Sequence, residues 1–272
     1  MNTLSTTSAK VLIVDDSASI RLTLKGFFAA ANIDVIGEAV NGLKLLQIIA
    51  ETSPDIICLD YYLPGINGFE LLKSIVAEFP HVSVVMVTGE LDPNFRSAVA
   101  DAGGAGFIHK PFTYDQVISE VTHVIHAKQL IAHATKQSAK ITTNGPLAQS
   151  TKRKTAIIAD DSKTMRELLK VILANQHVEV LAQATNGVQA VELSIEHRPD
   201  LLCLDIDMPG MNGLDALAAI RQKVTSTKVL MITGNSKRET VMSTYKLGAA
   251  GFILKPFDPD KIAEIIAKVL SD

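Results

Sequence analysis

The chain repeats itself at a fixed spacing of 145 residues, and this repeat restricts the fold more than any other feature of the sequence. VDDS at 14–17 returns as ADDS at 159–162, and PDIICLD at 54–60 returns as PDLLCLD at 199–205. LPGINGFE and GAGFIHKPF recur in the same register as MPGMNGLD and AAGFILKPF. Two long copies that align without an insertion indicate a duplicated domain, and they argue against a solenoid built of short repeats.

Within each copy, short runs rich in Val, Ile and Leu alternate with longer segments of helical periodicity. This alternation is typical of βα units around a parallel sheet, so we predict five strands and five helices in each copy. The expected strands of the first copy lie near residues 10–14, 33–39, 55–59, 82–87 and 105–108, with counterparts 145 residues later. Helix starts are indicated by Asp92 before Pro93, by a Thr113–Gln116 capping box and by Ser236–Glu239.

A segment without a counterpart separates the two copies. The second copy ends at Leu270, whose equivalent in the first copy is Ile125. We therefore predict a first domain at 9–127, a basic linker at 128–153 and a second domain at 154–272. The first part of the linker could prolong the last helix of the first domain.

The distribution of charge argues against a nucleic-acid surface. The net charge is −3, but Lys128–Lys154 holds six cations and no acidic residue, which leaves −9 on the rest of the chain. A nucleic-acid binder should carry a basic face on its folded part. Met1–Ser8 lacks the pattern of a signal peptide, and no apolar run approaches the ~18 residues of a membrane span. We expect a cytoplasmic protein that binds neither nucleic acid nor membranes.

The two cysteines lie inside apolar runs that we predict to be strands. In such a setting the thiols of Cys58 and Cys203 behave as small hydrophobic groups of the core. We expect neither a disulfide nor a metal site from them.

Polar side chains stand where the predicted strands end. In an open parallel sheet, functional groups gather at the carboxyl ends of the strands, because the loops there leave a crevice. Each copy places an acidic pair, a single Asp, a Thr and a Lys at these ends. They are Asp15, Asp16, Asp60, Thr88 and Lys110 in the first copy, and Asp160, Asp161, Asp205, Thr233 and Lys255 in the second. A helix N-cap would explain one Asp pair, but it does not explain complementary groups at four strand ends that all recur at one offset.

These residue types favour a site for phosphoryl transfer. Three carboxylates brought together repel one another, which raises at least one pKa unless a cation neutralises them. Mg²⁺ prefers oxygen ligands and usually shares a phosphate with them. A Lys supplies a point charge and a Thr supplies a hydroxyl donor for phosphoryl oxygens. Together the groups can stabilise the in-line transfer of a phosphoryl group onto one carboxylate.

At these residues the sequence resembles the receiver domain of two-component response regulators, over about 240 residues of the chain. The resemblance implies an α/β protein with two flavodoxin-like (βα)5 units, each a doubly wound parallel sheet of strand order 2-1-3-4-5. It implies that Asp60 and Asp205 are the phosphoacceptors. It also suggests cis peptide bonds before Pro111 and Pro256.

The remaining roles follow from the same resemblance. The Mg²⁺ ligands, for which Mn²⁺ can substitute, would be Asp15, Asp16, Asp60 and the backbone carbonyl of Tyr62, and in the second copy Asp160, Asp161, Asp205 and the backbone carbonyl of Asp207. The residues that contact phosphate and switch would be Thr88, Phe107 and Lys110, and in the second copy Thr233, Phe252 and Lys255. The family often has Tyr where both copies have Phe. An output that needs a phenol at this position, as in the chemotaxis receivers it resembles, is therefore in doubt.

The resemblance implies a regulatory phosphoprotein of a two-component system or phosphorelay, and not an enzyme. The phosphoryl donor would be a histidine kinase or a histidine phosphotransfer protein. We expect no DNA-binding or enzymatic output domain, because the second copy reaches the C-terminus. Output would then go through contacts with an unidentified downstream protein, through a phosphorylation-dependent dimer, or through service as a phosphate sink or relay.

Two further readings stay open. Asp205 and Asp207 are spaced like the nucleophile and the acid/base of a magnesium-dependent phosphatase of the haloacid-dehalogenase type, although the first copy has Tyr62 at the second position. A scaffold with one degenerate copy is the other reading, although both sets of site residues are complete. The copies also differ two residues after the switch Thr, with Glu90 against Asn235. We hypothesise that the two aspartyl phosphates hydrolyse at different rates, whereas loop drift after duplication would leave them equal.

Overall fold

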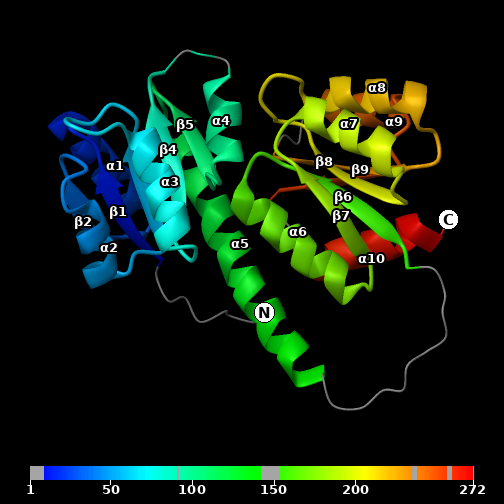
Figure 1. Ribbon diagram of the computed structural model, residues 1–272, viewed down its shortest axis with the longest axis horizontal. Helices are drawn as coiled ribbons and strands as arrows, with labels where there is room; N and C mark the ends of the chain where they lie inside the picture. The colour runs from blue at the N-terminus through cyan, green and yellow to red at the C-terminus, as the bar shows by residue number, and fades with distance from the viewer. Residues whose placement is uncertain are drawn as a thin grey trace. The chain divides into compact units, whose positions relative to one another are not determined.

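The structure is a computed structural model that describes residues 9–90, 92, 94–141, 153–234, 238–255 and 259–271, and for 133–141 and 259–260 it describes the backbone alone. The chain divides into two compact units, Met1–Ile125 and His126–Asp272. Each unit contains one five-stranded sheet in which every pairing between neighbouring strands is parallel. Figure 1 shows the strands of each sheet with helices on both sides.

The first sheet has the order β2-β1-β3-β4-β5, as predicted. Its elements are β1 (Lys10–Val14), α1 (Ala18–Ala30), β2 (Asp34–Ala39), α2 (Leu45–Thr52), β3 (Ile56–Asp60), α3 (Gly68–Glu78), β4 (Ser83–Thr88), α4 (Phe95–Asp101), β5 (Gly106–His109) and α5 (Tyr114–Ile141). Helix α5 continues past the first unit to Ile141, so the first part of the segment predicted as a linker is helical. The predicted domain boundaries themselves stay a prediction.

The second sheet has the order β10-β9-β8-β6-β7, which is the same order read from the opposite edge. Its elements are β6 (Thr155–Ala159), α6 (Lys163–Asn175), β7 (Glu179–Ala184), α7 (Gly187–His197), β8 (Leu201–Asp205), α8 (Gly213–Lys223), β9 (Lys228–Thr233), α9 (Arg238–Lys246), β10 (Gly251–Leu254) and α10 (Pro259–Ser271). Both units therefore have the flavodoxin-like fold that the sequence predicts.

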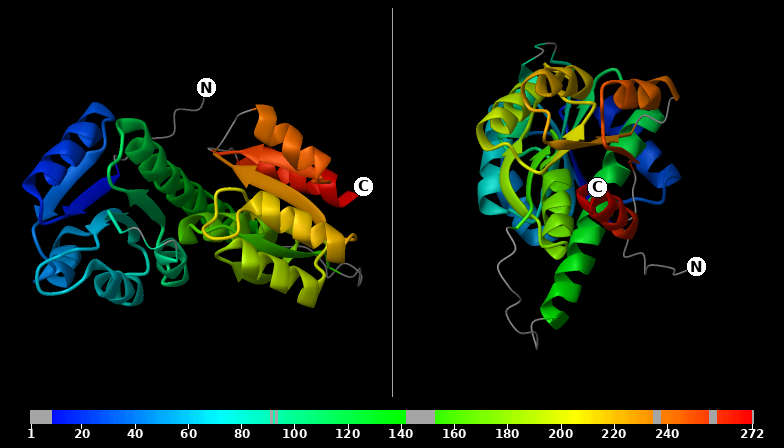
Figure 2. Two further views of the ribbon diagram at one scale, coloured as in Figure 1. Left: turned by 90° about the horizontal axis from the view of Figure 1, so that it is seen from above. Right: turned by 90° about the vertical axis from the view of Figure 1, so that its right-hand side faces the viewer.

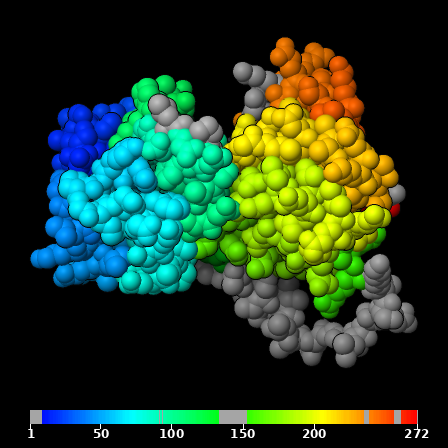
Figure 3. Space-filling model, turned by 45° about the horizontal axis from the view of Figure 1, so that its top comes forward, coloured from blue at the N-terminus to red at the C-terminus, as the bar shows by residue number. Residues whose placement is uncertain are grey.

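The central strands are continuous apolar runs in the sequence because helices cover both faces of each sheet. In the first unit, Ile13 and Cys58 pack with α1 and α5 on one face, whereas Leu12 and Leu59 pack with α2 and α3 on the other. The second unit repeats this arrangement, with α6 and α10 on one face and α7 and α8 on the other. Figure 2 shows these layers from two further sides, and Figure 3 shows residues of the second unit, in yellow-green and yellow, at the surface of one face.

Several local predictions are confirmed. Thr113 N donates to Gln116 Oε1 at 2.8 Å and Gln116 N to Thr113 Oγ1 at 3.4 Å, which is the predicted capping box. Cys58 and Cys203 are buried free thiols, as expected. The peptide bond between Lys110 and Pro111 is cis. Residues Pro93, Ser236 and Pro256 lie outside the described residues, so the predictions made on them are not addressed by the structure.

Among the described residues, no helix combines the length and the apolar character that a membrane crossing requires.

Candidate functional site

The predicted site residues of the first unit gather at the carboxyl ends of its strands. Asp15 and Asp16 follow β1, Asp60 ends β3, Thr88 ends β4 and Lys110 follows β5. Parallel strands that lie side by side bring these four positions together at one edge of the sheet. The second unit brings together the corresponding residues, Asp160, Asp161, Asp205, Thr233 and Lys255.

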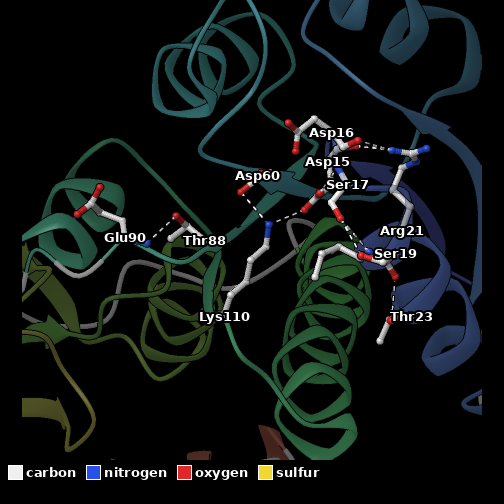
Figure 4. A network of polar contacts seen from close by, with 11 residues as sticks. Asp15, Asp16, Ser17, Ser19, Arg21, Thr23, Asp60, Thr88, Glu90 and Lys110 are labelled. Carbon is white, nitrogen blue, oxygen red and sulfur yellow. Dashed lines mark hydrogen bonds and ion pairs between the residues drawn. The ribbon is translucent and has the colours of Figure 1, made fainter.

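In the first unit, one ammonium group joins two carboxylates. Lys110 Nζ lies 2.7 Å from Asp15 Oδ2 and 3.0 Å from Asp60 Oδ1, and Figure 4 shows it between them. The side chains of Asp15 and Asp60 are only 2% and 4% exposed. The contact of Lys110 with Asp60 is an ion pair that lacks the geometry of a hydrogen bond, so Asp60 Oδ1 is a buried acceptor without a hydrogen-bond donor.

The acidic cluster of the first unit fits a hard divalent cation. Oxygen atoms of Asp15, Asp16 and Asp60 all lie within 4.8 Å of one another. Burial raises the pKa of Asp60, the neighbouring Lys110 opposes this, and the charge of Asp15 adds to it. A bound Mg²⁺ would stabilise the ionised carboxylates and would satisfy the buried oxygen of Asp60.

The cluster of the second unit has the same arrangement. Lys255 Nζ lies 2.7 Å from Asp160 Oδ2 and 3.2 Å from Asp205 Oδ1, and oxygens of Asp160, Asp161 and Asp205 lie within 4.8 Å of one another. Burial raises the pKa of Asp205 to about 8, with Lys255 opposing and the surrounding carboxylates reinforcing the shift. Burial alone would lower the pKa of Lys255, but the flanking carboxylates raise it. The ammonium therefore stays charged between two acidic groups.

A serine and the first Asp of each pair fix the loop that carries the pair. Ser17 caps α1 and Ser162 caps α6 through their side chains. In return, Asp15 Oδ1 accepts from Ser17 N at 2.9 Å, and Asp160 Oδ1 accepts from Ser162 N at 2.9 Å. The DDS motif is thus a helix cap as well as part of the site. One carboxylate oxygen holds the turn and the other faces the lysine.

A glycine lets each acceptor strand lie against the next helix. A Cβ at Gly68 would lie 1.9 Å from the backbone oxygen of Asp60, and one at Gly213 would lie 2.1 Å from that of Asp205. Only glycine permits this approach. The NG pairs of the two copies therefore set the backbone of the acceptor loop.

The two threonines predicted to switch, Thr88 and Thr233, are buried but have different partners. Thr88 Oγ1 accepts from Glu90 N at 3.0 Å. Thr233 Oγ1 donates to Asp207 Oδ2 at 3.0 Å. Both threonines are completely buried. The hydroxyl of Thr233 is thus already engaged by a carboxylate of its own site.

The two aromatic residues predicted to switch, Phe107 and Phe252, are half-buried. The Phe107 ring centroid lies 6.2 Å from that of Phe95 in an edge-on contact, and Phe107 N donates to Glu120 Oε1 at 3.0 Å. Phe252 is partly buried and packs against the core cluster that contains Met231 and Leu217. Their roles in switching stay a prediction.

The residues two positions after the acceptors differ in chemistry. Tyr62 is 58% exposed, and its hydroxyl donates to Glu90 Oε2 at 2.5 Å. This hydrogen bond raises the pKa of the Tyr62 phenol. Asp207 instead accepts from Thr233. Asn235, the counterpart of Glu90, lies outside the described residues.

An arginine in each unit belongs to the site, although the sequence analysis did not single it out. Arg21 Nη1 donates to the carbonyl oxygens of Asp15 at 2.8 Å and Asp16 at 3.1 Å. Arg166 Nη1 makes the same contacts with Asp160 and Asp161, at 2.8 and 3.1 Å. The repeat in the sequence could have identified them, because Arg21 and Arg166 are separated by the same 145 residues as Asp60 and Asp205.

Comparison with known proteins identifies both units. The family model described as response regulator receiver domain matches residues 11–122 and again residues 156–267. The Bacillus subtilis chemotaxis protein CheY is 41% identical over 115 residues, which are 42% of this chain and 96% of that protein. CheY of Thermotoga maritima is 39% identical over 116 residues, which are 43% of this chain and 97% of that protein.

The solved structures that resemble this chain align with less than half of it. The crystal structure of the response regulator domain of Thermotoga maritima CheB is 32% identical to the aligned part, with a TM-score of 0.41. The alignment covers 44% of this chain and 96% of that domain.

Proposed function

Since the chain belongs to the family of response regulator receiver domains, we propose that it accepts phosphoryl groups on Asp60 and Asp205 in a Mg²⁺-dependent reaction. The observation that carries this proposal is the repeated cluster. In each unit a buried Asp at the end of the third strand lies against a lysine ammonium and an acidic pair. The fully buried threonine at the end of the adjacent strand completes the set.

The chemistry assigns a role to each residue. A carboxylate oxygen of Asp60 forms a bond to phosphorus as the bond between phosphorus and the donor imidazole nitrogen breaks, and the donor leaves as a neutral histidine after taking up a proton. Lys110 and Thr88 offer an ammonium and a hydroxyl to the transferred phosphoryl oxygens. Asp15, Asp16 and the carbonyl of Tyr62 would hold Mg²⁺, which supplies positive charge to the phosphoryl group when bound. The second unit has the same roles at its corresponding residues. Lys255 and Thr233 would contact the phosphoryl oxygens, and Asp160, Asp161 and the carbonyl of Asp207 would hold Mg²⁺.

The expected partners follow from this chemistry. The donor is a histidine kinase or a histidine phosphotransfer protein in the cytoplasm. The phosphorylated protein signals through contacts with a downstream protein or through dimer formation, or it serves as a sink or relay for phosphoryl groups. The similarity to chemotaxis CheY proteins makes motility signalling one setting in which to look for these partners.

Intact mass spectrometry tests the proposal. The purified protein is incubated with Mg²⁺ and a small acyl phosphate, alongside Asp60→Ala and Asp205→Ala variants. We expect two added phosphoryl groups in the wild type, one in each variant, and none when EDTA replaces Mg²⁺. No added mass from either the acyl phosphate or a phosphorylated histidine phosphotransfer protein, with the fold intact, would contradict the proposal.

The same preparations address the phosphatase reading. In the unphosphorylated protein, the Asp207 carboxylate accepts a hydrogen bond from Thr233. We expect no sustained turnover of a generic phosphate ester. Turnover that is abolished by Asp207→Asn would favour a phosphatase over a phosphoacceptor.

A further inference from the structure

The two arginines that contact the acidic pairs carry an inference about the metal site. Each guanidinium uses one nitrogen to hold two consecutive carbonyl oxygens, at 2.8 and 3.1 Å, and the distances are the same in both units. Figure 4 shows Arg21 on the side of the acidic pair that is opposite to Lys110. The acidic pair therefore lies between two cations that contact different groups. The lysine contacts carboxylates, and the arginine contacts the backbone.

These contacts hold the backbone of the short stretch of chain that carries the acidic pair. Asp15 N donates to Ala39 O at 3.1 Å, which continues the pairing with β2. Asp16 follows before α1 begins, and its side chain is exposed. Hydrogen bonds from a charged donor are stronger than those between neutral groups. Arg21 is thus well placed to set the direction in which the Asp16 carboxylate leaves the backbone.

We propose that Arg21 and Arg166 are positioning residues for the divalent cation: by holding the backbone of the acidic pair, they keep both of its carboxylates directed at the acceptor Asp. This inference rests on the proposed function, because it takes the acidic pair as the place where the metal binds. Groups outside the ligand set that orient the ligands commonly affect metal affinity by about 10- to 100-fold.

The surroundings of Arg21 supply a matched control. Arg21 Nε also lies 3.1 Å from Glu38 Oε2, and Lys25 Nζ lies 3.3 Å from Glu38 Oε1. Glu38 is 42% exposed, and the second unit has Gln183 at the equivalent position. Because Arg166 contacts its carbonyls with Gln183 at that position, the ion pair with Glu38 is not part of the positioning contact. Glu38→Gln should therefore leave metal binding unchanged.

The test measures binding of Mn²⁺ to the full chain by electron paramagnetic resonance, without any phosphoryl donor. We expect two sites in the wild type. Asp16→Ala serves as the reference for loss of the first site. Arg21→Ala should weaken one site about tenfold or more, Arg166→Ala should weaken the other, and Glu38→Gln should weaken neither. Arg21→Lys and Arg166→Lys keep the charge but not the guanidinium geometry, so they should restore only part of the affinity.

Unfolding in EDTA separates positioning from general destabilisation, because it measures stability when no metal is bound. Arg166 is buried, so Arg166→Lys replaces Arg166→Ala if the alanine variant does not fold. Wild-type affinity in the folded alanine or lysine variants would overturn the inference and leave the proposed function standing. A loss of affinity in Glu38→Gln equal to that in Arg21→Ala would also overturn it. A wild-type protein that binds no Mn²⁺ and accepts no phosphoryl group would overturn the proposed function and this inference together.

Discussion

The two acceptor sites contain the same five residue types, but they differ in how closely the protein encloses them. The side chain of Lys110 is 20% exposed in the first site, whereas that of Lys255 is 10% exposed in the second. Asp16 is exposed, whereas Asp161 is partly buried. The second site also has the carboxylate of Asp207 nearby, where the first has a tyrosine. The second site therefore encloses its lysine and its acidic pair more closely, and its Asp205 has the carboxylate of Asp207 as an additional neighbour.

The switch threonines show what this difference does to the resting state. Thr88 uses its oxygen as an acceptor for Glu90 N, which leaves its proton available to a phosphoryl oxygen. Thr233 donates its proton to Asp207. Before Thr233 can contact a phosphoryl group, it must exchange one anionic acceptor for another. The two sites therefore have the same residue types but different hydrogen bonds before phosphorylation. Four predictions test this difference.

The largest expected effect concerns the stability of the metal-free protein. The pKa of Asp205 is raised from 3.8 to about 8. Between these two pH values the folded state therefore binds more protons than the unfolded state. The free energy of unfolding of the second unit should therefore fall as pH rises through this range. Asp205→Asn removes an ionisable group that is 2% exposed, and it should stabilise the unit by on the order of 3 kcal/mol at pH 7.

Urea denaturation in EDTA between pH 5 and about 8.5 measures this effect. Asp60→Asn is the matched control, for which we expect the same sign and a smaller effect, because the first site has Tyr62 in place of the Asp207 carboxylate. A pH-independent stability of the second unit, or a destabilising Asp205→Asn substitution, would contradict the contrast in burial.

The rate of phosphorylation should respond next most strongly. Asp207→Asn replaces the anionic acceptor of Thr233 by a neutral amide oxygen, and it removes one negative charge from the approach of an anionic donor. We expect the rate at Asp205 to rise by up to about tenfold, which corresponds to about 1.4 kcal/mol. The time course of mass gain with a small acyl phosphate, in an Asp60→Ala background, measures it.

The first site provides the reciprocal experiment. Tyr62→Asp introduces the second site's carboxylate and should slow phosphorylation of Asp60, whereas Tyr62→Phe keeps the ring and should change it little. If Asp207→Asn and Tyr62→Asp both leave the rates unchanged, the residue two positions after the acceptor does not distinguish the sites.

The lifetimes of the two aspartyl phosphates should differ by a smaller factor. The hydrogen bond between Tyr62 and Glu90 joins the loop after β3 to the loop after β4, and we expect this bridge to restrict the entry of water. The second site has a carboxylate that can orient water in place of this bridge. We expect phospho-Asp60 to last at least about threefold longer than phospho-Asp205, measured by mass loss after the donor is removed. Tyr62→Phe should shorten the first lifetime, and equal lifetimes would remove the hypothesis.

The smallest expected effect lies at the edge of the first site. Glu38 pairs with Arg21 and Lys25 at the surface, and the second unit has a neutral Gln183 there. Glu38→Gln should change the free energy of unfolding by less than about 0.5 kcal/mol, because exposed ion pairs contribute little and are screened by salt. Chemical denaturation at low and high ionic strength measures the change. A large, salt-independent loss would mean that the ion pair supports the site after all.

Much of the fold could be predicted because its signals are local and are repeated. Strands expected near 10–14 and 55–59 are found at Lys10–Val14 and Ile56–Asp60. Continuous apolar runs identify strands that are buried on both faces, and one offset shared by every motif rules out chance matches. The grouping of Asp60 with Lys110 was predictable for the same reason, because strand ends of a parallel sheet meet at one edge.

The sequence by itself determined the duplication, the two parallel sheets and the residues that gather at their edges, because these depend on periodicity and on strand order. Only the tertiary structure decided which group each side chain contacts. It assigned Arg21 to the backbone of the acidic pair, Tyr62 to Glu90, and Thr233 to Asp207. The contacts of Tyr62 and Thr233 join segments that are distant in sequence, whereas Arg21 must turn back from α1 onto carbonyl oxygens five and six residues before it. Their distances depend on how the whole sheet and its helices pack, which no local pattern encodes.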